Sequence, residues 1–260
     1  MGAYLGSIWN CRHFWLFLIK NDLQMRYRRS VLGVGWSLLH PLAAAVVTCA
    51  VFHAIFHMDV KDFGPFILCG LAWWAYMTGV TTQGCQSYVQ AESYIRQRPL
   101  PIAVYPLRVT LGAIIHLAIA LTLVLLLTWV FKGFGNLPAL VGLVPAILLL
   151  FLFGWSVAIL VGYLNVVFRD VQHFCDVCFQ ILFYLTPIVY PPHVVAGTRV
   201  GWLVHYNPLT LFLKLVREPI LEGRLPSLKC YAAAAAITLV LAVAAAVTLR
   251  FQQRKVVLYL

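Results

Sequence analysis

Charged residues are scarce in this sequence, and acidic ones are the scarcest. Asp and Glu together number 8 in 260 residues, and all charged residues make up 10% of the chain. Soluble domains are typically about 25% charged. Hydrophobic residues make up 62% of the chain, and no polar stretch is long enough to form a soluble domain with its own core. The composition predicts an integral membrane protein, and recurring apolar runs of roughly 20 residues predict that its spans are helices.

The motifs of several enzyme classes are missing as well. The sequence has no G-x-x-x-x-G-K-[ST] loop for a nucleotide, no G-x-S-x-G and no H-E-x-x-H. A proton- or sodium-coupled carrier usually places carboxylates inside its spans, whereas Asp176 is the only acid inside an apolar run. We therefore expect no catalytic residues and no bound cofactor in this chain. Either energy is supplied from elsewhere, or the protein is passive.

Histidine and cysteine occur at spacings that could bind a metal. His53 and His57 are four residues apart, and His173 lies close to Cys175 and Cys178. No nearby acid completes a hydrolase motif, and cysteines three apart on a helix are more often packing residues. We expect no metal site. The seven cysteines are scattered and odd in number, which argues against a disulfide framework.

The order of apolar runs predicts an all-α membrane protein with a single transmembrane domain over residues 1–260. Residues 1–30 are expected to form an amphipathic interfacial helix with a basic entrance. The predicted spans are 34–56, 63–84, 106–131, 138–164, 173–190 and 230–249. Between the last two, residues 193–229 are too polar and too broken by Gly and Pro for an ordinary span. Two short re-entrant helices fit this segment better.

The distribution of Lys and Arg predicts the orientation of these six spans. With six spans both termini lie on one side, and that side collects 12 of the 19 basic residues. By the positive-inside rule both termini are cytoplasmic. A net charge of +11 is explained by topology and anionic headgroups, and no nucleic-acid-binding motif is present. If residues 200–218 formed a seventh span, the C-terminus would lie outside.

A basic cluster stands directly before the first span, in "RYRRSVLGVGWSLLHPL". Arg26, Arg28 and Arg29 help to hold the N-terminus inside, and anchoring to lipid headgroups is the simplest interpretation. Three arginines without a lysine also suit a forked phosphate ligand, because a guanidinium binds two oxygens at once. Both interpretations stay open.

Four further groups of residues are candidate functional sites. Trp73, Trp74 and Tyr76 lie near the middle of the second span, where aromatic faces could stack on sugar rings or simply pack. Residues 86–100 form a polar loop with helical character and mixed charge, which could dock into a partner or be solvated. The remaining candidates are the polar link Arg169 and Asp170 on the cytoplasmic side, and a periplasmic gate of Tyr190, Trp202, Tyr206, Asn207 and Pro208.

Taken together and in order, five motifs resemble one family. They are the basic cluster quoted above, "IRQRPLPIAVYPL", "FRDVQHFCDVCFQILFYLTPIVYPP", "YNPLTLFLKLVREPILEG" and the terminal "RKVVLYL". This pattern resembles the transmembrane subunits of bacterial ABC transporters that export polysaccharides, and the C-terminal "VVLYL" looks closest to the O-antigen type. The family commonly has a basic-aromatic-Pro run where this chain has "RQRPLP".

The resemblance implies a homodimer in the bacterial inner membrane, with two copies of a separate ATP-binding subunit that binds ATP and Mg²⁺. It also implies lipid-linked polysaccharide as substrate, a channel between the two halves, and coupling to the ATPase through Glu92, Arg96 and Arg98. The alternatives are a permease for capsule, teichoic acid or a small lipid or drug-like substrate. A membrane-bound acyl- or glycosyltransferase is a third class, for which His205 and Glu218 are the nearest candidates.

Overall fold

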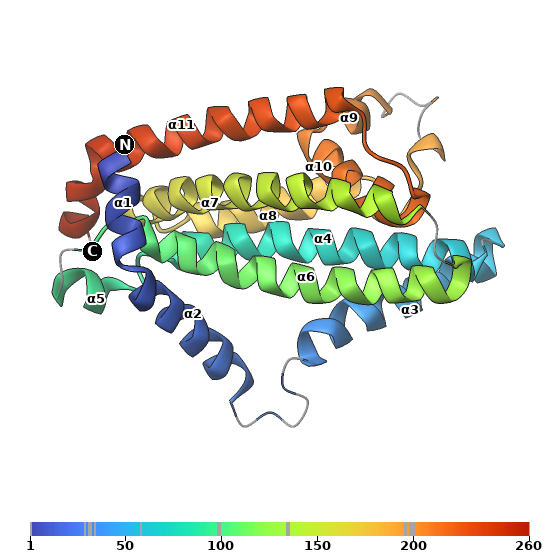
Figure 1. The fold of residues 1–260 in the computed structure, drawn as a ribbon, viewed down its shortest axis with the longest axis horizontal. Coiled ribbons are helices and arrows are strands. Elements are labelled where there is room, and N and C mark those ends of the chain that lie inside the picture. The colour runs from blue at the N-terminus through green and yellow to red at the C-terminus, as the bar shows by residue number, and fades with distance from the viewer. Residues whose placement is uncertain are drawn as a thin grey trace.

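The chain is a bundle of long helices with several short helices at its two ends (Figure 1). The computed structural model describes all residues except 1, 29, 31, 32, 34, 58, 98, 99, 134, 135, 195, 196, 198–200 and 260. The described part contains no strand, which confirms the predicted all-α class. Its helices are α1 (Gly2–Asn10), α2 (Arg12–Tyr27), α3 (Gly35–Phe56), α4 (Val60–Gln86), α5 (Glu92–Gln97), α6 (Val104–Lys132), α7 (Leu143–Val167), α8 (Val171–Leu185), α9 (Gly201–Tyr206), α10 (Pro208–Arg217) and α11 (Leu228–Tyr259).

Four segments of the described chain are long and apolar enough to cross a membrane. They are α4, α6, the 3₁₀ turn Leu137–Gly142 with α7, and the Leu228–Phe251 part of α11. Two shorter apolar helices, Leu38–Ala54 within α3 and Val171–Leu185, coincide with the first and fifth predicted spans. Helix α8, which corresponds to the fifth predicted span, ends at Leu185 and not at the predicted residue 190, because the chain turns at Thr186 and Pro187.

Figure 1 places both termini at the same end of the bundle, where α1 and α5 also lie. The start of α11 and the short helices α9 and α10 lie toward the opposite end. Helix α3 runs obliquely to the long helices, and α2 and α3 slope away from the bundle and approach each other at the end of α2 and the start of α3. The chain therefore has one end that carries the termini and one end that carries the broken segment before α11.

Helix α4 is the centre of the core, packed against α3, α6, α7 and α8. Small residues allow its close approach to α7: a Cβ added to Gly84 would lie 2.9 Å from Cα of Ala158, and one added to Gly162 would lie 2.8 Å from the carbonyl oxygen of Gly84. Such contacts between small residues are typical of helices packed within membranes. A buried amide fixes the same interface, since Nδ2 of Asn165 donates to the carbonyl of Cys85 at 2.9 Å.

The N-terminal segment, predicted as one amphipathic helix, is broken at Cys11 into α1 and α2. Helix α1 docks on the start of α6, where the backbone N–H of Ala103 donates to the Tyr4 hydroxyl at 3.4 Å. Burial raises the pKa of Tyr4, which keeps it a neutral phenol. Helix α2 then packs along α6 through Leu18 and Ile19. The break lets one segment follow two directions. Its position in a membrane interface stays a prediction.

The segment before α11 forms two short helices, as the Gly and Pro pattern predicts. Asn207 ends α9 and caps α10, where its Oδ1 accepts from the N–H of Leu209 at 2.9 Å and Pro208 occupies the first turn. Helix α10 packs against α4, α7 and α11 and continues into one π-helical turn, Glu218–Glu222. Re-entrance into the membrane stays a prediction.

Candidate functional site

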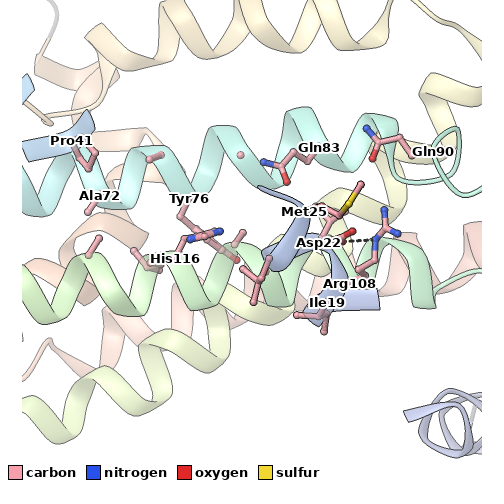
Figure 2. A pocket seen from close by; sticks show the side chains of 18 residues that line it. Ile19, Asp22, Met25, Pro41, Ala72, Tyr76, Gln83, Gln90, Arg108 and His116 are labelled. Carbon is pink, nitrogen blue, oxygen red and sulfur yellow. Dashed lines mark ion pairs between the residues drawn. The ribbon is translucent and has the colours of Figure 1, made fainter. Parts of the chain in front are cut away.

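A crevice of about 480 Å³ runs between α4 and α6 on the side from which α2 and α3 diverge (Figure 2). We call it the α4/α6 crevice. Small residues line much of it, and Figure 2 shows polar residues near Arg108 at one end and His116 farther along, beside Tyr76. The small residues are Ala72, Ala75, Gly79, Gly112, Ala113 and Ala120. The polar residues are Asp22, Gln83, Gln90, Arg108 and His116.

An ion pair crosses the polar end of this crevice. Nε of Arg108 lies 3.0 Å from Oδ2 of Asp22, and the dashed line in Figure 2 marks this contact. The Arg108 side chain is 9% exposed and that of Asp22 is 47% exposed. Among the described residues, Nε of Arg108 has no partner with hydrogen-bond geometry. A buried cation is thus neutralised by a carboxylate that solvent can reach.

A second hollow, of about 400 Å³, lies between α4 and α8, and we call it the α4/α8 groove. Its aromatic residues are Trp74, Phe179, Phe183 and Tyr184, and its polar residues are Thr78, Thr82, Asp176 and Gln180. The ring of Trp74 lies 5.3 Å from Phe179 and 5.6 Å from Phe183. Oγ1 of Thr82 donates to Asp176 at 3.1 Å. Aromatic faces beside hydroxyl, amide and carboxylate groups can bind a polyhydroxylated ring.

The three aromatic candidates are placed in different surroundings. Trp73 is 0% exposed and lies in the core. Tyr76 is also buried, and its hydroxyl donates to the carbonyl of Leu150 on α7 at 2.6 Å, although its ring borders the α4/α6 crevice. Only Trp74 reaches the α4/α8 groove. A sugar-stacking role therefore depends on Trp74 and on residues of α8 that the sequence pattern did not single out.

The predicted basic entrance is only partly described. Arg28 is exposed at the end of α2. Arg29 lies outside the described residues, and so does the side chain of Arg26. The structure adds Arg108 to this region, because α2 runs from Asp22, beside Arg108, to Tyr27, next to Arg28.

The predicted coupling loop contains helix α5. Ile95 is buried against Leu18 and Tyr105 and fixes one face of α5. Glu92 and Arg96 form an exposed ion pair at 2.9 Å on the solvent side, and Arg98 lies outside the described residues. Arg169 and Asp170 form the exposed turn between α7 and α8, where the carbonyl of Asp170 accepts from the N–H of Phe174. Both segments present charged groups to solvent.

The residues predicted to form a periplasmic gate divide into buried and exposed groups. Nδ2 of Asn207 donates to the carbonyl of Leu185 and to Oγ1 of Thr186 and thereby joins α10 to the end of α8. The Tyr190 hydroxyl donates to the carbonyl of Tyr184 at 2.8 Å. Trp202 and Tyr206 are 62% and 77% exposed.

A buried arginine that the sequence pattern did not single out as a site residue holds the same region together. Arg217 of α10 donates to the carbonyls of Pro187 at 2.6 Å, Ile188 at 2.8 Å and Phe66 at 3.1 Å. Its guanidinium also lies 3.6 Å from the ring centroid of Phe66. Arg108 was missed in the same way. For Arg108 the available signal was an arginine inside the apolar helix α6, since an ionisable residue in a span is a functional candidate by default.

The alternative of a membrane-bound acyl- or glycosyltransferase finds little support among the described residues. The side chain of His205 lies outside the described part, and Glu218 pairs with Arg224 at 3.3 Å. No group of three or more His, Cys, Asp or Glu residues in the described chain is placed to hold a metal. The site features are instead two elongated hollows along helices, one with a buried cation and one with aromatic rings.

Comparison with known proteins agrees with this architecture. The model of the family described as "ABC-2 type transporter" matches residues 13–221. The chain is 26% identical over 211 residues to the "O-antigen export system permease protein RfbA" of Klebsiella pneumoniae, which covers 81% of each chain. It is 25% identical to the Myxococcus xanthus protein of the same name over 90% of each. It is 22% identical to the "Polysialic acid transport protein KpsM" of Escherichia coli over 79% of this chain and 80% of that protein. A match over most of the chain to the family model, in a helical protein with apolar spanning segments, shows that this chain belongs to the ABC-2 type transporter membrane-protein family.

Proposed function

We propose that this chain is the channel-forming subunit of an ATP-driven exporter that moves a lipid-linked polysaccharide of the O-antigen type out of the cytoplasm. Two copies of the chain form the channel in the bacterial inner membrane, and two copies of a separate ATPase subunit bind ATP and Mg²⁺. The names of relatives from Klebsiella pneumoniae, Myxococcus xanthus and Escherichia coli support polysaccharide as the cargo.

The α4/α8 groove is the observation that carries this proposal. A polysaccharide presents hydroxyl groups and the apolar faces of its rings, and the groove offers both kinds of partner along two neighbouring helices. Trp74, Thr78 and Thr82 follow one another at four-residue spacing and therefore lie on one face of α4. Rings that bind through stacking tolerate sliding, because each sugar unit presents a similar face. This suits a path for a polymer better than a tight pocket.

The exposure of α8 supports a second copy of the chain beside the groove. No residue of α8 is buried, although the helix is apolar and lies against α4. Its outward side chains include Phe174, Val177, Ile181 and Tyr184. An apolar helix with polar groups such as Asp176 and Gln180 is costly to leave in lipid. A partner copy would cover the apolar side chains and enclose the polar ones in a channel.

We also propose six spans with both termini cytoplasmic. The 22 residues of α3 would extend about 33 Å, enough for a tilted crossing. The 15 residues of α8 would extend only about 22 Å, and residues 186–190 complete its crossing in irregular form. In this orientation α5 faces the cytoplasm with Glu92 and Arg96, where the ATPase would dock. The helices α9 and α10 then form the periplasmic gate.

Deletion of the gene in its source organism tests the cargo. We expect surface polysaccharide to disappear and lipid-linked polymer to accumulate inside the cell. The composition of the accumulated polymer distinguishes O-antigen from capsule or teichoic acid. Unchanged surface polysaccharide of all three kinds would refute the proposal and leave a small lipid or drug-like substrate as the better alternative.

Substitution of Trp74 tests the path. A stacked ring contributes on the order of 1 kcal/mol, so Trp74→Ala should lower export several-fold without abolishing it, and Trp74→Phe should restore most of it. Trp129→Ala is the matched control, because Trp129 lies on α6 outside the groove. Equal export rates for Trp74→Ala and the wild type would contradict sugar stacking at this groove.

A further inference from the structure

Two cysteines meet where helices α4 and α8 pack together. Cys85 of α4 is 0% exposed, whereas Cys175 of α8 is partly exposed. The two thiols are hydrogen-bond partners of each other. All seven cysteines are free in the structure, so this contact joins two reduced thiols. Touching thiols of which solvent can reach one have the arrangement from which oxidation forms a disulfide.

Two hydrogen bonds set how the helices face each other around this pair. Oγ1 of Thr82 donates to Oδ1 of Asp176 at 3.1 Å, and the side-chain amide of Gln86 donates to that of Gln172. The cysteine of α4 follows Thr82 by three residues and stands just before Gln86. The cysteine of α8 follows Gln172 by three residues and stands just before Asp176. Residues three and four apart share a helix face, so the thiols lie on the facing sides of two antiparallel helices, between the two hydrogen bonds.

The two cysteines differ in how firmly they are held. The carbonyl of Cys85 accepts from Nδ2 of Asn165 on α7 at 2.9 Å, and the neighbouring Gly84 packs directly on Ala158. Helix α8 has no buried residue, although it lies against α4 and α7. Cys85 is therefore fixed in the bundle, whereas Cys175 lies on a helix that can shift with little disturbance of the core. A disulfide between them would remove that freedom.

The pair lies at one end of the α4/α8 groove. Thr82 and Asp176 both line the groove, and the two cysteines stand directly beside them. Helix α5, which follows the end of α4, lies at the end of the bundle that carries both termini (Figure 1). The proposed orientation places this end in the cytoplasm, where thiols are normally kept reduced and the disulfides that do form are usually transient and redox-sensing.

We propose that Cys85 and Cys175 are a redox-sensitive pair, which hydrogen peroxide converts to a disulfide that holds α8 against α4 and keeps the α4/α8 groove from widening. Formation of the disulfide does not depend on what the protein transports, whereas its effect on transport rests on the proposed function. A polymer that slides along the groove needs α8 to follow the changing width of its units. A covalent link to the fixed Cys85 blocks this movement.

The oxidation takes two steps. The sulfur of Cys175, the more exposed of the two, attacks one oxygen of hydrogen peroxide; the O–O bond breaks, a sulfenic acid forms, and the other oxygen leaves as water with the thiol proton. The sulfur of Cys85 then attacks the sulfenic sulfur; the S–S bond forms, the S–O bond breaks, and a second water leaves with the proton of Cys85. The two thiols lose two electrons to the peroxide, and a reducing dithiol reverses the change.

Two variants of the full-length chain that keep two cysteines each test the pairing. One keeps only Cys85 and Cys175, and its matched control keeps only Cys85 and Cys178, three residues further along α8; Ser replaces the other cysteines. Each protein is purified in detergent, treated with hydrogen peroxide, denatured, and assayed for free thiols by the gel shift that a maleimide-linked polymer causes. The first protein should lose both thiols at least tenfold faster than the control and remain a single chain on a non-reducing gel. Equal rates, or a disulfide between two copies, would overturn the pairing.

Single variants decide the matter if so many replacements prevent folding. In peroxide, the otherwise native chain and Cys178→Ser should each lose two thiols to an internal disulfide. Cys85→Ser should form no internal disulfide and should keep a sulfenic acid on Cys175, which dimedone labels. An internal disulfide that forms in Cys85→Ser as fast as in the native chain would show that Cys85 is not the partner.

Export provides the second readout. Peroxide should lower export by the wild type several-fold, dithiothreitol should restore it, and Cys85→Ser and Cys175→Ser should continue to export in peroxide. These two variants also control for oxidation of the ATPase subunit. A disulfide that forms while export continues unchanged would refute control of the groove. Because the disulfide is measured on the purified chain, its failure to form is a separate result from a gene deletion that leaves surface polysaccharide unchanged.

Discussion

Removing the guanidinium of Arg217 should destabilise the end of the bundle that carries α10. Arg217→Ala would leave the carbonyls of Pro187 and Ile188 without the donors they now have at 2.6 and 2.8 Å. No other hydrogen bond to either oxygen is found among the described residues. A buried carbonyl left unsatisfied costs about 1–3 kcal/mol, so the loss of unfolding free energy should be roughly 2–6 kcal/mol from these two groups. The contact with the ring of Phe66 would be lost in addition.

The same contact can be disturbed from α4. A Cβ added at Gly70 would lie 2.5 Å from Nη2 of Arg217 and 2.9 Å from the carbonyl oxygen of Ile188. Gly70→Ala should therefore lower the unfolding temperature of the full chain in detergent, even though Ala is the better helix former. Gly64→Ala on the same helix is the matched control, since its nearest neighbour would be Sγ of Cys49 at 3.9 Å.

The double variant gives the sharpest result. Because both substitutions break one contact, Gly70→Ala with Arg217→Ala should cost little more than Arg217→Ala alone. Thermal unfolding followed by tryptophan fluorescence measures the wild type and the four variants. Equal unfolding temperatures for Gly70→Ala and Gly64→Ala would show that Arg217 does not join α10 to α4 as described, and full additivity in the double variant would show that the two residues act separately.

The remaining predictions concern the partner, the entrance and the gate. Glu92→Lys should uncouple ATP hydrolysis from export at normal protein abundance, because an exposed pair such as Glu92–Arg96 contributes only about 0.3–0.5 kcal/mol to stability; normal export would contradict docking at α5, and Glu92→Gln is the milder comparison. Arg28→Lys with Arg29→Lys keeps the charge, so topology should persist while export and substrate-stimulated ATPase fall if a forked phosphate contact matters, and full export would reduce the patch to an orientation signal. Cysteines at Trp202 and Tyr206, in a background without native cysteines, should be labelled only from the periplasm, whereas cytoplasmic labelling would indicate a seventh span.

Helix positions were predictable because the apolar runs are long and their ends are marked. The structure starts α6 at Val104 and ends it at Lys132, close to the predicted 106–131. The break at Asn207 and Pro208 was equally visible, because an Asn before Pro is a strong start signal for a helix. In both places a local rule decides the local structure.

The sites were less predictable because they depend on contacts between distant segments. Trp73 and Trp74 are neighbours in sequence, yet Trp73 is in the core and Trp74 borders the groove, since successive helical residues point in different directions. Asp22 and Arg108 are 86 positions apart, and only the docking of α2 on α6 brings them together. The distribution of Lys and Arg along the sequence predicts that the segments with Asp22 and Arg108 lie on the same side of the membrane, but it does not predict that the two side chains are in contact.

The two buried arginines of the described chain are suited to opposite roles by the kind of acceptor each one has. Arg217 is held by neutral carbonyls of the backbone, which cannot leave without unfolding the segments that carry them. Nε of Arg108 lies 3.0 Å from the carboxylate of Asp22, on a side chain that is 47% exposed. Loss of the Arg217 contacts therefore disturbs the backbone itself, whereas loss of the Arg108 contact separates one side chain of α2 from α6.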